Sequence, residues 1–444
     1  MFEPQAASQV LSNHRATGKR SSDAPLTRQP VKADPETEAS PSFGRGVFAW
    51  GFVAQIFSSA TNFGLTLLAG RLLGPGGLGI VVLGFGAYQL VAGLQRALVT
   101  QPIIADAAPL VGDKRRQLAD SGLSVVAWSG IAATLVVIAV GAGVGSAAGR
   151  GVLVFAPWMV VALLQDYWKA ILFQEGRGSA GAASDFIRFA VAALMVPVAV
   201  VWTKDYIVVA GWGLGAAAGL AIALWSFPGR PPRPSAAFVA WRQRAWGLGR
   251  WLGAREIVFQ IFAYSTILIL ALILGTDGLG GLRSAEALFS PFSLVAAALV
   301  LPALPALSRA AAYSHARALD LAFRMCAVAV GFGLTYMLVM AFIGPWLLVY
   351  LFGQPFSPFT DLVWPMAAVQ VLNAAGVSFT LLLSAENRGP ASLIAGVAYS
   401  AATTIFAAVC ALFYGVSGAA WGMAIGASIG SVAVVYLALR GRKP

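Results

Sequence analysis

Long, uninterrupted apolar runs fill the chain from about residue 47 onward, and short polar or glycine-rich stretches separate them. Several runs exceed the roughly 18 residues that a membrane-spanning helix requires. Because the runs are continuous rather than alternating, they differ from the strands of a membrane β-barrel. The pattern predicts twelve helical spans at about 47–69, 78–99, 119–141, 150–173, 183–203, 206–227, 251–274, 280–305, 321–343, 361–383, 390–413 and 417–439.

Composition strengthens this prediction. Of the 444 residues, 58% are hydrophobic and 11% are charged, whereas a soluble domain carries about 25% charged residues. We therefore predict an all-α integral membrane protein with about twelve transmembrane helices. Residues 1–45 are polar and rich in charge and proline, which predicts a disordered tail. No short apolar core follows an N-terminal basic region, so we do not expect a cleavable signal peptide.

Lysine and arginine gather on one side of the predicted topology. An even number of spans puts both termini on the same side of the membrane. Loops and helix ends on that side carry most of the basic residues, Arg188 among them, whereas the other side holds only Arg71, Arg150, Lys204 and Arg283. The positive-inside rule then predicts that both termini are cytoplasmic. Because this bias accounts for the net charge of +12, nucleic acid is not an expected partner.

A nearly repeated turn divides the chain into two halves. The stretch LLGPGGLG at residues 72–79 resembles LGTDGLGG at residues 274–281, and Gly74 aligns with Gly275 at an offset of 201 residues. A second marker, EGRG at 175–178, resembles ENRG at 386–389. Six spans per half make the repeat parallel. We predict a cytoplasmic tail (1–45), a first lobe with spans 1–6 (46–227), a cytoplasmic linker (228–250), a second lobe with spans 7–12 (251–439) and a cytoplasmic C-terminus (440–444).

Several local features follow from this organisation. The turn glycines are expected to take positive φ and to let helices approach closely. The aromatic stretch within 344–360 predicts a short segment at the membrane interface. The Pro- and Arg-rich linker predicts a basic surface helix near its end, which would contact anionic lipid head groups. Two equivalent bundles suit a transporter, because they can rock around a central cavity and give alternating access; a passive scaffold is the alternative.

The first half contains the stretch TNFGLTLLAGRLLGPGGLGIVVLGFGAYQLVAGL. It resembles the polysaccharide-export branch of the multidrug/oligosaccharidyl-lipid/polysaccharide (MOP) exporter superfamily. Members often show an Asn or Gln in the first span and then an R-x-L-G-P-x-x-x-G turn. The stretches LPALPALSR (301–309) and LLLSAENRGPAS (381–392) resemble that branch as well, and the resemblance covers residues 45–439. The matching residues of the first motif are Asn62, Arg71, Leu73, Gly74, Pro75 and Gly79.

This resemblance implies a two-lobed fold of twelve helices in the cytoplasmic membrane. It also implies a flippase for undecaprenyl-diphosphate-linked glycans that enter O-antigen, capsule, exopolysaccharide or cell-wall polymers. The expected partners are the lipid-linked glycan substrate, membrane lipids and polysaccharide assembly proteins.

Polar residues inside the spans form the candidate site, because such residues are costly in a bilayer and commonly functional. Gln55 and Asn62 are seven residues apart and share one face of the first span. At the same offset of 201, Gln55 aligns with Glu256 of the seventh span, which lies beside Arg255 and one turn before Gln260. The resemblance implies that these two spans line the central cavity; hydrogen bonds that join helices are the alternative.

Arginines are the candidates for contacting a diphosphate, because a guanidinium can bind phosphate oxygens in a bidentate manner. They are Arg96, Arg255 and Arg283. Snorkelling to the interface is the alternative for Arg96, and a self-neutralising pair with Glu286 is the alternative for Arg283. In the fourth span Asp166 and Lys169, three residues apart, form either a local ion pair or a coupling site. Both of those readings remain open.

Two other functions remain open. A cation-coupled multidrug antiporter of the same superfamily needs a carboxylate within its lobes to bind Na⁺ or H⁺. The first span has none, and Asp166 and Glu256 each have a cationic neighbour. A membrane glycan polymerase or ligase needs a sizeable loop with catalytic residues, and the predicted outer loops are short.

We expect no catalytic residues, metal or cofactor. The chain has two histidines, His14 and His315, which disfavours zinc chemistry. Its two cysteines, Cys326 and Cys410, lie within apolar runs and are expected to be small core residues. The protein is therefore predicted to be a transporter and not an enzyme.

Overall fold

A computed structural model describes residues 45–386 and 388–440. At a few helical positions, Arg255 among them, only the backbone is described. The predicted tail lies outside the described residues apart from Arg45, which begins the first helix, and so do residues 441–444. The following description concerns the compact unit over residues 43–444.

The described part of this unit is helical and contains no strand. Its first half comprises α1 (Arg45–Gln95), the π-helical turn η1 (Arg96–Thr100), α2 (Gln101–Ala107), α3 (Gly112–Val144), α4 (Ala147–Gln174), α5 (Gly178–Leu194), α6 (Val196–Val201) and α7 (Asp205–Ser226). Then follow α8 (Pro234–Arg244), α9 (Trp246–Ala287), α10 (Ser290–Tyr313), α11 (His315–Phe352), the 3₁₀ segment η2 (Gln354–Leu362), α12 (Val363–Ala385) and α13 (Gly389–Leu439).

Within the described residues, nine helical stretches are long and apolar enough to cross a membrane. Three of them contain a glycine with non-helical backbone angles: Gly74 in α1, Gly275 in α9 and Gly415 in α13. At each glycine the chain reverses direction, so each of these stretches contains one span before the glycine and a second span after it. The span that starts after Gly275 extends beyond α9 into α10. Counted in this way, the described chain has twelve spans, as the sequence predicted.

The repeated turn has the same geometry in both halves. Gly74 has φ 71° and ψ −173°, and Gly275 has φ 70° and ψ −178°. A side chain at such a φ is strained, because Cβ crowds the following carbonyl. The predicted need for glycine is therefore confirmed at both positions. We call residues 45–73 span 1, 75–107 span 2, 246–274 span 7 and 276–313 span 8.

The two turns pack against each other. A Cβ at Gly79 would lie 2.0 Å from the carbonyl oxygen of Thr276, and a Cβ at Gly280 would lie 2.0 Å from the carbonyl oxygen of Pro75. This reciprocal contact is possible only for glycine, which lets two backbones approach this closely. We call the end of the unit with these turns the far end. The opposite end, which carries α8, is the linker end.

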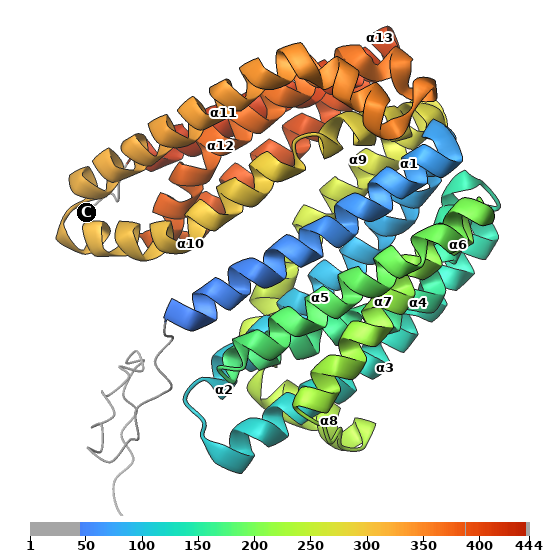
Figure 1. The fold of residues 1–444 in the computed structure, drawn as a ribbon. Coiled ribbons are helices and arrows are strands. Elements are labelled where there is room, and N and C mark those ends of the chain that lie inside the picture. Colours follow the sequence, from blue (N-terminus) through green and yellow to red (C-terminus); the bar gives the residue numbers. More distant parts are fainter. Residues whose placement is uncertain (1–44, 387, 441–444) are drawn as a thin grey trace, which may run out of the picture. The chain divides into compact units, whose positions relative to one another are not determined.

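Each half packs mainly with itself. In Figure 1, α3 to α7 gather on one side of α1 and α10 to α13 on the other, with α9 beside α1. At the far end the buried apolar core is continuous across both halves. At the linker end of the second half, a separate cluster forms its own core. That second cluster includes Leu307, Ala318, Phe379, Leu383 and Val434. The two halves are thus joined by apolar packing at the far end, and part of the linker end is separate.

Two local predictions need comment. The ninth span was expected to end near residue 343, but α11 continues to Phe352. The short segment η2 follows after Gly353, and its position at a membrane interface stays a prediction. The linker helix forms in the middle of the linker rather than near its end, as α8. Its Trp241 donates a hydrogen bond from Nε1 to the carbonyl oxygen of Leu98 (3.0 Å), which ties α8 to span 2.

Candidate functional site

A cavity of about 420 Å³ lies between the two halves of the unit. Spans 1, 2, 7 and 8 form most of its wall, and α12 and α13 contribute Met366, Thr403 and Met423. The wall combines apolar side chains with a small number of polar groups, which is the usual composition of a small-molecule site. The polar and aromatic lining residues are Asn62, Thr66, Phe85, Gln89, Gln260, Tyr264, Thr266, Arg283, Glu286 and Thr403. We call this space the central cavity.

Four of the sequence-predicted residues line the central cavity: Asn62, Gln260, Arg283 and Glu286. Arg283 Nη1 lies 2.9 Å from Glu286 Oε2, and both side chains are partly exposed, at 30% and 44%. These charges therefore form a pair on the cavity wall and are not buried behind it. Asn62 Oδ1 accepts a hydrogen bond from Trp212 Nε1 of α7 (3.2 Å), which orients the amide.

Gln55 occupies a different position. It lies two turns before Asn62 on the same helix, as the spacing predicted, but it does not join the central cavity lining that the structure describes. Its side chain is exposed, and Nε2 donates to Ser59 Oγ one turn later (3.2 Å). The structure therefore separates these two residues along span 1, with Gln55 nearer the linker end.

A second cavity, of about 510 Å³, lies against span 7 toward the linker end. Glu256, Asn373 and Tyr399 are among its lining residues. Glu256 Oε1 accepts a hydrogen bond at 2.7 Å from Nε2 of Gln260, which lines the central cavity, so the walls of the two cavities are in contact. The side chain of Arg255 lies outside the described residues.

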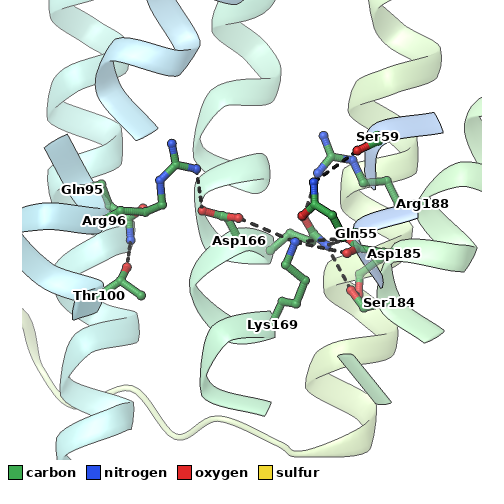
Figure 2. Close-up of polar contacts among 12 residues, drawn as sticks. Gln55, Ser59, Gln95, Arg96, Thr100, Asp166, Lys169, Ser184, Asp185 and Arg188 are labelled. Atoms are coloured by element: carbon green, nitrogen blue, oxygen red, sulfur yellow. Dashed lines mark hydrogen bonds and ion pairs between the residues drawn. The ribbon is translucent and has the colours of Figure 1, made fainter. Parts of the chain in front are cut away.

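The first half contains a chain of charged groups inside the membrane-spanning region (Figure 2). Arg96 Nη1 lies 3.3 Å from Asp166 Oδ2 of α4. Lys169 Nζ lies 3.8 Å from Asp166 Oδ1 and 3.2 Å from Asp185 Oδ2 of α5. The predicted pairing of Asp166 with Lys169 is therefore present, but it is the longest of these contacts. The closer partners come from distant parts of the sequence.

The buried end of this network holds Arg188. Its Nη1 donates to Gln165 Oε1 (3.0 Å), while Gln165 Nε2 donates to Asp185 Oδ1 (3.0 Å). The Arg188 guanidinium also lies over the Trp212 ring, 4.8 Å from its centroid. Arg188 is 5% exposed and Asp185 1%. The sequence analysis placed Arg188 among basic residues at the cytoplasmic helix ends, and the structure corrects this by burying it within α5.

The sequence analysis also missed Asp185. The sequence does contain a signal for Asp185 and Arg188, because a carboxylate and an arginine three residues apart are unusual within an apolar membrane span. Their partner Gln165 lies on another helix, so the pairing itself was not readable from spacing. The whole network holds three cations and two carboxylates: Arg96, Lys169, Arg188, Asp166 and Asp185.

Arg96 lies at the edge of this network nearest the central cavity. It follows the cavity-lining Gln89 by seven residues, which places it on the same face of span 2, two turns toward the linker end. It begins the π-helical turn η1, a feature that occurs frequently at functional sites. Its side chain is 40% exposed. Arg96 does not itself belong to the central cavity lining given above; its partly exposed guanidinium lies beyond that cavity toward the linker end and contacts Asp166 of α4.

Together these contacts describe a site with two partly exposed arginines, each paired with a carboxylate. Arg96 stands toward the linker end and Arg283 toward the far end. A guanidinium on an apolar cavity wall offers a bidentate donor for phosphate or carboxylate oxygens. Asn62, Gln89 and Gln260 add amide groups that can donate to and accept from hydroxyl groups.

No protein-family model matches the chain, and no curated protein matches it. Solved structures do share its fold. A lipid II flippase, MurJ, in an inward closed conformation aligns with a TM-score of 0.71 at 13% identity, over 88% of this chain and 87% of that one. An inward-facing multidrug resistance MATE family transporter of the MOP superfamily aligns with a TM-score of 0.66 at 16% identity, over 86% and 94%.

A MOP superfamily transporter from Pyrococcus furiosus aligns with a TM-score of 0.59 at 16% identity, over 89% of this chain and 95% of that one. Identities this low establish a common fold and leave the substrate open. The alignments span nearly the whole length of each structure, so they include both halves. The chain is an all-α, multi-pass membrane protein with the fold of the MurJ flippase and the MATE transporters.

Proposed function

We propose that this protein is a transporter of the MOP superfamily. It moves a polyprenyl-diphosphate-linked oligosaccharide across the cytoplasmic membrane by alternating access, for surface polysaccharide biosynthesis. The observation that carries the proposal is the central cavity between the two halves, with the partly exposed Arg283 on its wall and the partly exposed Arg96 two turns beyond Gln89 toward the linker end. Such a cavity can take up a diphosphate and its sugars, while the polyprenyl chain stays in the lipid.

The direction of transport rests on the basic residues. Arg242 and Arg244 of α8 and Arg309 of α10 lie at the linker end and are exposed. The positive-inside rule therefore supports a cytoplasmic linker end. The packing described above concerns the conformation: the core is continuous across both halves at the far end and divided at the linker end, so we infer that this state is closed at the far end. The substrate would enter from the cytoplasmic leaflet in this state.

Apolar exposure on span 1 is consistent with a lipid tail alongside the cavity. Phe52 and Ile56 near the linker end are 40% and 38% exposed. They share one face of span 1 with the exposed Gln55, so this face offers apolar surface to lipid and an amide to a polar group. We propose that the polyprenyl chain lies against this face of span 1. Membrane lipids occupy the same surface when no substrate is bound.

Deletion of the gene tests the proposed function. We expect lipid-linked glycans to accumulate in the cytoplasmic leaflet and the matching surface glycan to be lost, and the wild-type gene should restore it. A complementing copy with Arg96→Gln and Arg283→Gln should express but fail to restore the glycan. Unchanged glycans and no trapped intermediate, in a strain without a second flippase, would refute the proposal.

A cation-coupled multidrug antiporter is the second candidate. It is favoured by the similarity to MATE transporters and by the buried carboxylate Asp185 within the first half. Lys169, which contacts this group, and Asp166, which contacts Lys169, are the proposed coupling residues in either case. Against the antiporter, both carboxylates already have cationic partners at 3.2 to 3.3 Å. Drug accumulation in the deletion strain, with surface glycans unchanged, would favour the antiporter.

A further inference from the structure

The two arginines that we propose to contact the substrate are both paired with a carboxylate. Arg96 lies 3.3 Å from Asp166, and Arg283 lies 2.9 Å from Glu286. We call these the linker-end pair and the far-end pair. An anion that binds either arginine must share it with, or take it from, a carboxylate that is already present. The pairs therefore reduce the affinity that a free arginine would offer.

The pairs lie at different depths in the membrane. Arg96 follows the Gly74 turn by 22 residues, and Arg283 follows the Gly275 turn by 8. Because the two turns pack against each other at the same level, a rise of 1.5 Å per residue separates the two arginines by about 20 Å along the helices. A head group that crosses the membrane would meet the two pairs in succession.

The two carboxylates differ in whether a second cation stays beside them when the arginine moves away. Asp166 keeps a second cation, since Lys169 Nζ lies 3.8 Å from its Oδ1. Among the described ion pairs, Glu286 has Arg283 alone. Lys169 can therefore take the place of Arg96 beside Asp166, whereas no second cation in the described ion pairs can take the place of Arg283 beside Glu286. Arg96 is therefore released to an incoming anion more easily than Arg283.

We propose that Asp166 and Glu286 are positioning residues that compete with the substrate diphosphate for Arg96 and Arg283. Asp166 yields its arginine readily, so the diphosphate is captured at the linker end. Glu286 takes its arginine back, so the diphosphate is released at the far end. This proposal rests on the proposed function, and it predicts that removing either carboxylate traps the substrate.

Binding to the purified full-length protein in nanodiscs tests this. The probes are undecaprenyl diphosphate, which carries both tail and head group, and inorganic pyrophosphate, which carries the head-group chemistry alone. Asp166→Asn and Glu286→Gln keep the shape of each side chain and remove its charge. We expect both variants to bind undecaprenyl diphosphate about 3- to 10-fold more tightly than wild type. This factor corresponds to the usual interaction free energy of a partly exposed ion pair.

The change should be larger for Glu286→Gln, and both variants should turn over more slowly in a flipping assay. Pyrophosphate should show the same order at lower affinity. Asp320→Asn is the matched control, because it removes the carboxylate of an exposed Arg–Asp pair on α11 (2.9 Å to Arg324) that lies away from the cavity. It should change neither binding nor transport.

The outcomes separate this inference from the function on which it rests. If Arg96→Gln and Arg283→Gln weaken binding while both carboxylate variants leave it unchanged or weaken it, the competition is wrong and the flippase stands. If wild type binds no undecaprenyl diphosphate, the proposed function itself fails. If one carboxylate variant does not fold, the other variant alone still tests the competition, because tighter binding is expected for each of them.

Discussion

The packed turns at the far end offer a direct test of alternating access. Adding a methyl group at Gly79 and at Gly280 places each new Cβ 2.0 Å from a backbone carbonyl oxygen of the other half. Such contacts do not occur below 3.0 Å, so the turns must separate by at least about 1 Å. Overpacking of this kind costs about 1–3 kcal/mol.

This free-energy cost destabilises only the conformation in which the far end is closed. If the two halves rock, the double variant Gly79→Ala, Gly280→Ala shifts the equilibrium toward an open far end by about 5- to 150-fold, since 1.4 kcal/mol equals a factor of ten. Gly64→Ala is the matched control on span 1, because no atom lies within 4 Å of its Cβ position. It should leave the equilibrium unchanged.

The assay measures access to the central cavity from the far side. Both native cysteines, Cys326 and Cys410, are free thiols and can be replaced by serine. A single new cysteine at Ala263, an exposed residue of the cavity wall, then reports labelling by an impermeant maleimide added outside spheroplasts. We expect the double variant to label severalfold faster than the control. Equal labelling in a correctly folded double variant would refute the rocking motion.

Three further variants test the architecture. Arg188→Gln removes a buried guanidinium and its hydrogen bond to Gln165 Oε1, which should cost about 1–3 kcal/mol, measured as a lower melting temperature in detergent. Trp212→Phe removes the hydrogen bond to Asn62 but keeps an aromatic ring beside Arg188, so we expect a loss of about 1 kcal/mol on the same assay. Gly275→Ala adds a Cβ that meets no atom within 4 Å, but the residue has φ 70° and ψ −178°, a region almost restricted to glycine, so backbone strain alone should cost about 1–3 kcal/mol; an unchanged melting temperature would contradict that turn geometry.

Much of the fold was predictable because the bilayer imposes it. Apolar runs of a fixed minimum length had to be helices, and the repeated glycine turns had to reverse the chain. The prediction was less accurate for the end of the ninth span, which was expected near residue 343, whereas α11 continues to Phe352. Hydropathy could not show this, because an aromatic segment at the interface and an extension of the helix have similar sequences there.

The site was predictable only in part. Arg283 and Glu286 are three residues apart on one helix, so their pairing followed from spacing. Arg96 and Asp166 are 70 residues apart, and their contact depends on how α4 packs against span 2. Spacing suggested Lys169 as the partner of Asp166, but Lys169 lies closer to Asp185 on a third helix. Contacts between helices decide such networks, and a single sequence does not contain them.

Transport by the purified chain tests the central claim most directly. Proteoliposomes would contain the full-length protein and a fluorescent polyprenyl-diphosphate oligosaccharide, and a membrane-impermeant reductant would report the leaflet that holds the probe. The account predicts that the protein carries the probe between leaflets, and that Arg96→Gln with Arg283→Gln abolishes this movement. Probe that stays in its original leaflet at the rate of protein-free liposomes, with the protein folded and inserted, would contradict it.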